Sequence, residues 1–386
     1  MGGDPVLQTT TPVQRALVVA RDIEARASAH DRAASFPFEN FADLHRAGLL
    51  QLAVPVAFGG PATSLAEMIE VVRIVGAADA STALVLVMHY LQLGSGLRSR
   101  RWPEAIRRRL AHDALEGVSL VNALRTEPEL GTPARGGLAE TVARRTEGGW
   151  RISGHKIYST GAPLLGWGLV WARTEDETPR IGFWLVPMKA PGVSMVETWD
   201  HLGLRASGSH DTLFDNVFVP EDHAVDIRLP KEWAELDPFQ AAFHPVALAA
   251  LYEGVAVAAR DWLVGYLKTR KPSNLGASLA TLPHFQEAVG EIDAMSSVNR
   301  LLVDETAAKL DRDPASVTAE AAGLVKFTVT SNAIRIVERA LQLTGNPGLS
   351  HARPLERYFR DVQCSRVHSP QNDSILRFAG RAALGL

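Results

Sequence analysis

The central third of the chain has a different pattern of apolar and turn residues from the two parts that flank it. Between residues 117 and 228, short apolar runs rich in valine, tryptophan and phenylalanine alternate with glycine, proline and aspartate, as in GWRISG, WGLVWA, IGFWLVP and TLFDNVFV. Runs of this length between turn residues predict β-strands. The sequence therefore predicts a compact sheet domain inserted between two other parts of the chain.

Helices are predicted on both sides of this segment. Within residues 13–115, the run SLAEMIEVVRIVG has apolar residues at helical spacing, and Ser64 followed by Glu67 predicts a capping box at its start. After residue 229, three apolar runs of about 25 residues exceed the usual length of a globular helix, which favours a bundle. The apolar face of the first run comprises Leu65, Met68, Ile69, Val72 and Val75.

These patterns predict an α+β protein with three domains. We expect an N-terminal helical domain over residues 1–116, a β domain over 117–228 and a C-terminal four-helix bundle over 229–386. The first residues are expected to form a disordered leader. Because the long helices have apolar residues on more than one face, contact between subunits is expected as well.

Composition argues against several classes of function. The 386 residues are 46% hydrophobic and 22% charged, with a net charge of −3, so no nucleic-acid or membrane-surface partner is expected. No apolar run reaches the length that spans a bilayer, and the N-terminus lacks the pattern of a secretion signal. The single cysteine, Cys364, is typical of a reducing compartment. We expect a cytoplasmic protein.

Four motifs stand in a fixed order along the chain. TEPELGT covers residues 126–132, GHKIYSTG 154–161, LGLRASGSHDTLFDNVFVP 202–220 and ALQLTGNPGLSHARPLERYFRD 340–361. Their sequences and order resemble those of the acyl-CoA dehydrogenase superfamily, over nearly the whole chain. The resemblance implies a flavoenzyme with a helical, a sheet and a second helical domain, working as a homotetramer or a dimer.

The resemblance also implies which residues bind the flavin. Hydrogen-bond donors suit the polar edge of a redox ring, and cationic or amide donors suit phosphate. Arg270 is followed by Lys-Pro-Ser-Asn, where the superfamily has the Phe-Gly that holds the adenylyl half of FAD. FMN is therefore favoured, with FAD possible. The implied set comprises Thr126, Gly131, Thr132, Tyr158, Thr160 and Gln371, with Arg270, Gln342 and Gly345 supplied by a neighbouring subunit.

The base of a dehydrogenase is missing from its expected positions. An acyl-CoA dehydrogenase removes the α-proton of its substrate with a carboxylate, usually the glutamate of a Y-E-G-T sequence eight residues after R-D. Counted from Arg360 and Asp361, those positions hold His-Ser-Pro-Gln at 368–371. The alternative position, ten residues before Gly254, holds His244. Dehydrogenation would need a relocated acid.

A second branch of the superfamily fits better. RVHSP at 366–370, IYSTG at 157–161 and MHY at 88–90 resemble the flavin-dependent monooxygenases of the dibenzothiophene monooxygenase type. This resemblance implies a two-component enzyme that receives reduced flavin from a separate reductase and uses O2 on a small organosulfur, amine or aromatic substrate. The chain has no Gly-x-Gly-x-x-Gly after a predicted strand and no metal-binding motif.

Catalytic roles follow from that second resemblance. We expect His368 to act as proton donor or base, Ser159 to contact the flavin or the peroxide, and His89 to line the site with Tyr90. Ser369 is expected in the substrate pocket. Each has a structural alternative, such as a core position for His89. Two other functions stay open, an acyl-CoA dehydrogenase with a displaced base and a flavin-binding protein without turnover.

Overall fold

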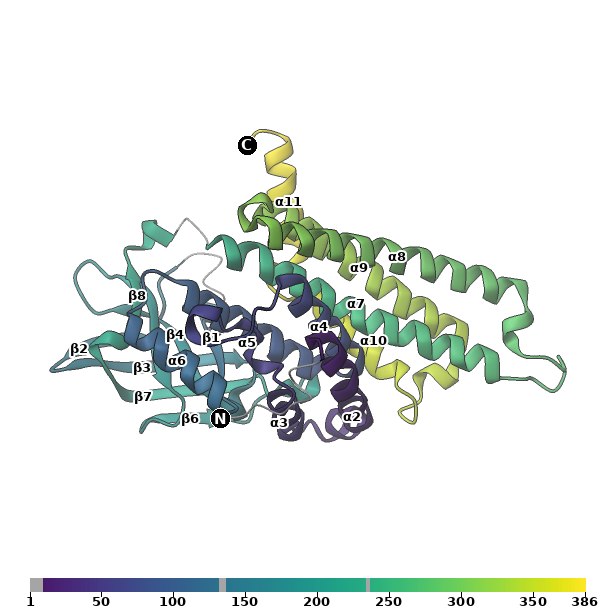
Figure 1. Cartoon of the computed structure of the whole chain (residues 1–386), viewed down its shortest axis with the longest axis horizontal. Helices are drawn as coiled ribbons and strands as arrows, with labels where there is room; N and C mark the ends of the chain where they lie inside the picture. The colour runs from purple at the N-terminus through teal and green to yellow at the C-terminus, as the bar shows by residue number, and fades with distance from the viewer. Residues whose placement is uncertain (1–9, 132–136, 234–236) are drawn as a thin grey trace.

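A helical domain, a sheet and a bundle of long helices follow one another along the chain (Figure 1). The computed structural model describes residues 10–131, 137–233 and 237–386. This order confirms the predicted α+β architecture. The predicted leader lies mostly outside the described residues.

The N-terminal domain packs its helices around the almost entirely buried helix α5. Helix α4 begins at the predicted capping box, where the Ser64 hydroxyl accepts a hydrogen bond from the Glu67 amide and the Glu67 carboxylate accepts one from the Ser64 amide. The predicted apolar face of α4 is buried. The elements are α2 (Pro12–Ala33), α3 (Phe38–Arg46), η1 (Leu50–Ala53), η2 (Val56–Phe58), α4 (Leu65–Ala78), α5 (Ala80–Arg98) and α6 (Glu104–Glu116).

Eight strands form one mixed sheet with the order β6-β7-β3-β2-β4-β5-β8, and β1 pairs in parallel with β4. The strands are β1 (Leu120–Leu124), β2 (Val142–Thr146), β3 (Gly149–Ser159), β4 (Leu165–Thr174), β5 (Ile181–Pro187), β6 (Val193–Val196), β7 (His210–Pro220) and β8 (Ala224–Arg228). Strand β1 ends just before the first motif and β3 ends within the second. The sheet thus brings these two motifs to neighbouring positions.

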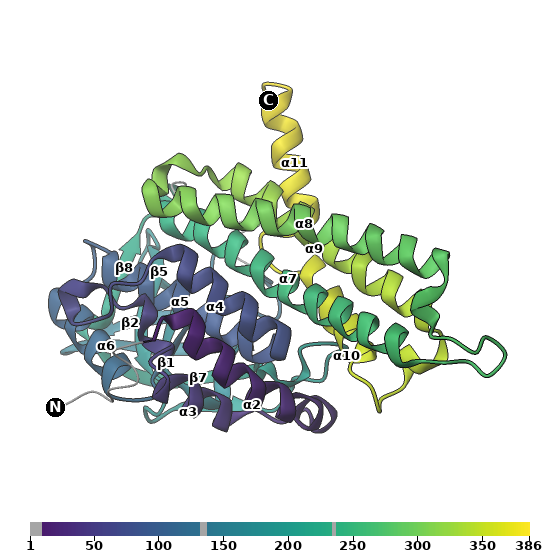
Figure 2. The same ribbon diagram turned by 45° about the vertical axis from the view of Figure 1, so that its right-hand side comes forward.

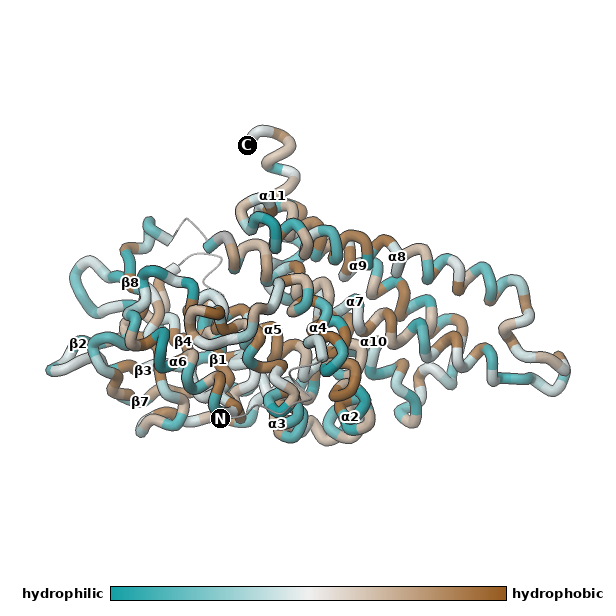
Figure 3. Tube along the Cα trace, viewed as in Figure 1, coloured by the Kyte–Doolittle hydropathy of each residue, from teal (hydrophilic) through white to brown (hydrophobic). Residues whose placement is uncertain are grey.

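The C-terminal domain consists of α7 (Pro238–Thr269), α8 (Pro283–Arg312), α9 (Ala319–Thr344), α10 (Leu355–Gln363) and α11 (Asn372–Ala383). The long helices α7, α8 and α9 lie side by side, and α10 packs against α7 and α9. Hydrophobic and hydrophilic residues alternate along these helices (Figure 3). Helix α11 projects away from the bundle in both views (Figures 1 and 2).

Contrary to the expectation that no apolar run is long enough, two helices of the described residues could cross a membrane by length and composition alone, namely α5 and most of α7. Their apolar windows are 89% and 78% buried inside the fold. Burial of this extent is what a core helix requires, and α5 packs directly against α4, α7 and β1. These two helices therefore form the core that joins the three domains.

Candidate active site

A buried ion pair locks the first two motifs together. The Lys156 ammonium lies 2.6 Å from the Glu127 carboxylate, and both side chains are almost completely buried. The same carboxylate accepts hydrogen bonds from the Thr141 hydroxyl and amide, while the Ile157 amide donates to the Thr126 carbonyl. Burial raises the pKa of Glu127, but Lys156 and Thr141 outweigh it and hold that pKa below its ordinary value.

The end of β3 combines an exposed aromatic residue with buried hydroxyls. Tyr158 has a left-handed φ of +57°, and its ring is 54% exposed. The Thr160 hydroxyl lies 2.9 Å from that of Ser209. Ser159 is fully buried, and its hydroxyl has no hydrogen-bond partner among the described residues. Only Tyr158 of these three residues presents a large exposed surface to a ligand.

The loop of the first motif turns back on itself at Gly131. Its amide and that of Glu127 exchange hydrogen bonds with each other's carbonyls, at 2.9 and 3.1 Å. Gly131 has a φ of +68°, and a side chain added there would meet open space. Thr132, the next predicted flavin ligand, lies outside the described residues.

His89 and Tyr90 lie in the core and hydrogen-bond to the backbone, and their predicted roles at the site stay predictions. Both ring nitrogens of His89 are occupied, since Nδ1 accepts from the Val121 amide at 3.2 Å and Nε2 lies 3.1 Å from the Leu50 carbonyl. The Tyr90 hydroxyl donates to the Leu49 carbonyl at 2.5 Å. Both side chains are buried in the core. They join α5 to β1 and η1.

His368 lies against Tyr252 of α7. The phenol oxygen is 2.7 Å from Nδ1 of the imidazole. Burial, together with smaller contributions from the nearby Lys326 and His244, lowers the pKa of His368 to about 3. Burial raises the pKa of Tyr252 well above its ordinary value. Both rings are therefore neutral across the physiological pH range.

Lys326 holds the loop on which His368 stands. Its ammonium lies within 2.9–3.1 Å of the carbonyls of Ser365, His368 and Pro370 and of Oδ1 of Asn372. The side chain comes from α9 and is completely buried. Burial lowers its pKa to about 8. A single cation thus fixes the backbone on both sides of the histidine.

Two further groups face the same region. Burial lowers the pKa of His244 to about 4, with contributions from the charges of Lys326 and Arg125. Nε2 of His244 is buried without a hydrogen-bond partner in the described part of the chain. Arg125, which follows β1, lies over the rings of Trp171 and Phe183. The region between α7, α9 and β1 is therefore lined by imidazoles and cations.

Ser369 and Gln371 flank this region on either side of Pro370. Ser369 is exposed, and Gln371 caps α11 while its amide donates to the Val367 carbonyl at 3.4 Å. The predicted places of Ser369 in a substrate pocket and of Gln371 at the flavin stay predictions.

Three predicted flavin ligands lie at the opposite end of the bundle. Arg270 terminates α7, while Gln342 and Gly345 lie at the end of α9. All three are exposed, and the ends of α7 and α9 point away from the sheet (Figure 1). One chain does not bring them to Tyr158 or His368, so any joint site with them would require a second copy of the chain.

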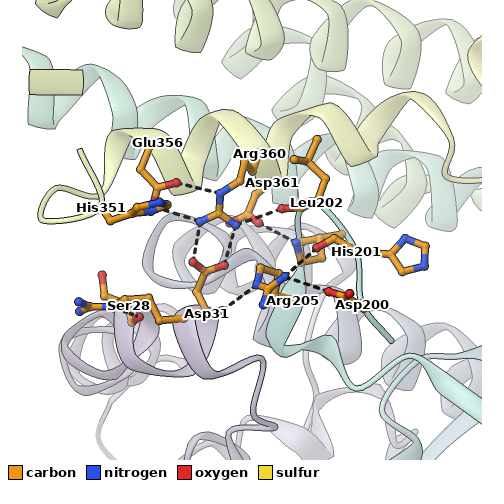
Figure 4. Close-up of polar contacts among 12 residues, drawn as sticks. Ser28, Asp31, Asp200, His201, Leu202, Arg205, His351, Glu356, Arg360 and Asp361 are labelled. Atoms are coloured by element: carbon orange, nitrogen blue, oxygen red, sulfur yellow. Dashed lines mark hydrogen bonds and ion pairs between the residues drawn. The ribbon is translucent and has the colours of Figure 1, made fainter. Parts of the chain in front are cut away.

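A polar network ties the three domains together next to the third and fourth motifs (Figure 4). Arg360 of α10 forms an ion pair with Asp31 of α2 at 2.6 Å. Arg205 donates to the Asp31 carbonyl at 2.9 Å, and Asp361 accepts from the Leu204 amide at 2.7 Å. These motif residues connect the three domains to one another.

The end of β3 and the first motif fit a flavin ring. A buried hydroxyl without a protein partner at Ser159, an exposed Tyr158 ring and an open turn at Gly131 are the kinds of groups that a ring with a polar edge needs. A metal is not indicated, because the described residues contain no group of His, Cys, Asp or Glu that could hold one.

Sequence reasoning missed Glu127, Lys156, Tyr252, Lys326 and Arg125. A signal existed for Lys326, which is a lone cation in the apolar run GLVKFTVT of a long helix. A lysine that is buried there must find several acceptors. Tyr252 gave no such signal, because an aromatic residue in an apolar helix is ordinary core.

Fold and site together define a flavin-dependent oxidoreductase class of three domains, and comparisons place the chain within it. Models of the N-terminal, middle and C-terminal domains of acyl-CoA dehydrogenases match residues 14–99, 123–217 and 243–383. The putative acyl-CoA dehydrogenase YdbM of Bacillus subtilis is 30% identical over 361 residues, covering 93% of this chain and 92% of that protein. The chain belongs to the acyl-CoA dehydrogenase superfamily.

Other similar proteins are named for different chemistry. L-evernosamine nitrososynthase of Micromonospora sp. is 29% identical over 400 residues, covering 97% of this chain and 91% of that protein. The structure of KijD3 in complex with FMN and dTDP-3-amino-2,3,6-trideoxy-4-keto-3-methyl-D-glucose has a TM-score of 0.85 and 27% identity, covering 100% of this chain and 95% of that one. The proteins similar to this chain thus include one named as an acyl-CoA dehydrogenase and one named as a nitrososynthase.

Proposed function

We propose that this protein is a two-component monooxygenase that uses reduced FMN and O2 on a small organosulfur, amine or aromatic substrate. The observation that supports it most directly is the neutral His368 bound to Tyr252 where a dehydrogenase has its carboxylate. An imidazole with a pKa of about 3 is too weak a base to remove a carbon-bound α-proton efficiently. As a fixed hydrogen-bonding group it suits oxygen chemistry.

The buried acids nearest to this region are engaged elsewhere. Glu253, next to Tyr252 in α7, lies 2.8 Å from Arg73 and faces α4. Asp361 accepts from the Leu204 amide. Among the described residues, neither expected position holds an acid and no carboxylate hydrogen-bonds to His368 or His244. This arrangement disfavours α-proton abstraction.

The flavin is assigned to the first two motifs. Thr126, Gly131, Tyr158 and Thr160 would hold its ring, and Arg270, Gln342 and Gly345 of a second subunit would complete the site, with Gln371 close by. Bound reduced flavin supplies two electrons, with which one oxygen atom enters the substrate and the other leaves as water. A separate reductase is assigned to supply the reduced flavin, and a homotetramer is the proposed assembly.

His368 is the proposed catalytic residue. The phenol of Tyr252, which keeps its proton, is assigned as the donor to Nδ1, and this tautomer leaves the second nitrogen, Nε2, protonated. This tautomer offers a fixed N–H donor to an oxygen atom in the site. Lys326 holds the backbone of the loop, so the donor stays in position while the substrate reacts.

The relatives support an amine among the three substrate classes. Nitrososynthases are 29% identical to the chain over almost its whole length, and KijD3 was crystallised with FMN and an amino sugar nucleotide. These names also support FMN over FAD. We infer an amine, of the three classes, as the first to test.

An acyl-CoA dehydrogenase is the second candidate, because the relative with 30% identity is named as one. A flavin-binding protein without turnover is the third. Two assays separate the three candidates. In the first, the protein is supplied with FMN, NADH, a flavin reductase and labelled dioxygen, and the products formed from amines, thioethers and phenols are analysed by mass spectrometry. In the second, protein with bound FAD is mixed with an acyl-CoA thioester without oxygen.

A product with one labelled oxygen atom would support the proposal. Anaerobic bleaching of bound FAD by an acyl-CoA thioester would support the dehydrogenase instead. No flavin binding in either redox state would contradict both enzymes.

A further inference from the structure

Arg125 has no counterion among the residues that the structure describes. Its guanidinium lies 5.2 Å from the ring centre of Trp171 and 5.9 Å from that of Phe183. Its Nε is buried without a hydrogen-bond partner, and within residues 10–131, 137–233 and 237–386 no carboxylate forms an ion pair with it. Charged groups buried in proteins are normally paired, because an unpaired one is costly. Arg125 is only partly buried, but its buried Nε and its missing counterion leave the guanidinium able to take a partner.

Arg125 adjoins the candidate active site, since it directly precedes the first motif. Burial lowers the pKa of Arg125 itself, and its charge contributes to the low pKa of His244. Part of its surface remains accessible, so a ligand can reach its N–H groups.

No acidic group of the described chain neutralises this region. Glu127 is the nearest acid in sequence, and its carboxylate already forms an ion pair with Lys156 and accepts a hydrogen bond from Thr141. His244 and His368 are neutral at physiological pH, and the charge of Lys326 adds to that of Arg125. The local field is therefore positive and favours an anion.

We propose that Arg125 binds an anionic oxygen group of the substrate, such as a carboxylate, a sulfinate or a phosphate. This assignment rests on the proposed function and uses its site, and the anionic group is a second group of the substrate, separate from the amine, sulfur or aromatic group that reacts. The guanidinium lies over two aromatic rings, and its N–H groups can bind two oxygens of one anion. Lysine matches this geometry poorly, since it offers a point charge on a flexible stem.

The test uses three small probes that share one carbon skeleton, namely benzoate, benzamide and benzylamine. Their dissociation constants are measured by titration calorimetry with the full chain, for the wild type, Arg125→Met and Arg125→Lys. Arg353→Met is the matched control, because Arg353 also lies over an aromatic ring, that of Tyr266, at a distance from the site.

In the wild type, benzoate is expected to bind at least about 10-fold more tightly than benzamide, as a charged hydrogen bond predicts, and benzylamine most weakly. In Arg125→Met the ratio of benzoate to benzamide affinity falls to about one, and in Arg125→Lys it is intermediate. Arg353→Met retains the wild-type ratio. Equal binding of benzoate and benzamide by the wild type, or an unchanged ratio in Arg125→Met, would overturn the assignment.

The phosphate of FMN is the competing source of an anion. FMN and riboflavin are therefore titrated in parallel. If Arg125→Met weakens FMN but not riboflavin and keeps the benzoate preference, Arg125 serves the cofactor and the proposal fails. Since these titrations need no turnover, the binding result stands apart from whether the protein oxygenates anything, and the labelled-dioxygen assay alone decides the latter.

Discussion

The phenol of Tyr252 lies 2.7 Å from Nδ1 of His368, although the two residues are 116 positions apart in the sequence. The contact connects the middle of α7 to the loop before α11. It fixes which nitrogen of the imidazole is available to a ligand, because only Nε2 remains free of it.

Replacing Tyr252 by phenylalanine is expected to keep the fold and to remove the hydrogen bond that orients the His368 ring. Loss of one hydrogen bond costs about 1 kcal/mol of stability, and the free rotation of the ring is expected to lower the oxygenation rate about 10-fold. Denaturant unfolding and product formation measure the two effects. In the double variant with His368→Ala, the phenylalanine should add almost nothing, and full additivity would show that the two residues act independently.

Replacing Lys326 by methionine is expected to release the loop that holds His368. The variant loses four oxygen contacts, so we expect a fall in turnover with little change in FMN affinity. Lys326→Arg should not rescue turnover, since a guanidinium is too large for the same set of acceptors. A variant that loses FMN binding and turnover in parallel would point to a general structural role.

The Glu127–Lys156 pair is expected to govern both stability and flavin binding. Removing either partner leaves a buried charge unpaired, which costs about 3–5 kcal/mol. Glu127→Gln and Lys156→Met are compared with the double variant by urea unfolding, and the double variant should lose less than the sum of the two single losses. The exposed pair Arg144–Glu175 provides the control, and removing either of its partners should lower stability far less.

Buried neutral histidines predict a loss of stability in acid. Burial lowers the pKa of His89 to about 4, although its bond to the Leu50 carbonyl acts in the opposite direction. The folded value lies below the unfolded value of about 6.5, so this contribution is complete above pH 6.5 and is lost as the pH falls toward 4. Between pH 7 and 4.5, His89→Gln should lose about 2 kcal/mol less of its unfolding free energy than the wild type does. Parallel pH profiles would contradict a neutral His89.

Local patterns predicted the fold well, and the reason is physical. The Ser64–Glu67 capping box and the apolar face of α4 depend on residues three or four positions apart, so the sequence displays them directly. The strands of the sheet domain were likewise visible in their short apolar runs. The order of the strands and the packing of α10 on α7 depend on distant contacts that no local pattern contains.

The active site was predicted only where a motif included the residue. His368 was found through RVHSP, whereas its partners Tyr252 and Lys326 belong to helices α7 and α9 with no distinguishing local sequence. His89 was assigned to the site because MHY at 88–90 resembles the monooxygenase branch. Its partners are backbone groups of β1 and η1, which a sequence pattern does not show.

The proposed monooxygenase activity depends most on how protein-bound reduced FMN reacts with O2. Protein with bound reduced FMN is mixed with O2 in a stopped-flow instrument, and oxygen consumption and hydrogen peroxide release are followed together, for the wild type, His368→Ala and the exposed control His284→Ala. We predict that the wild type and the control release peroxide with a clear delay after oxygen is consumed, and that His368→Ala binds FMN but releases peroxide without delay. Immediate and stoichiometric peroxide release by the wild type, at the rate of free reduced FMN, would contradict the central claim.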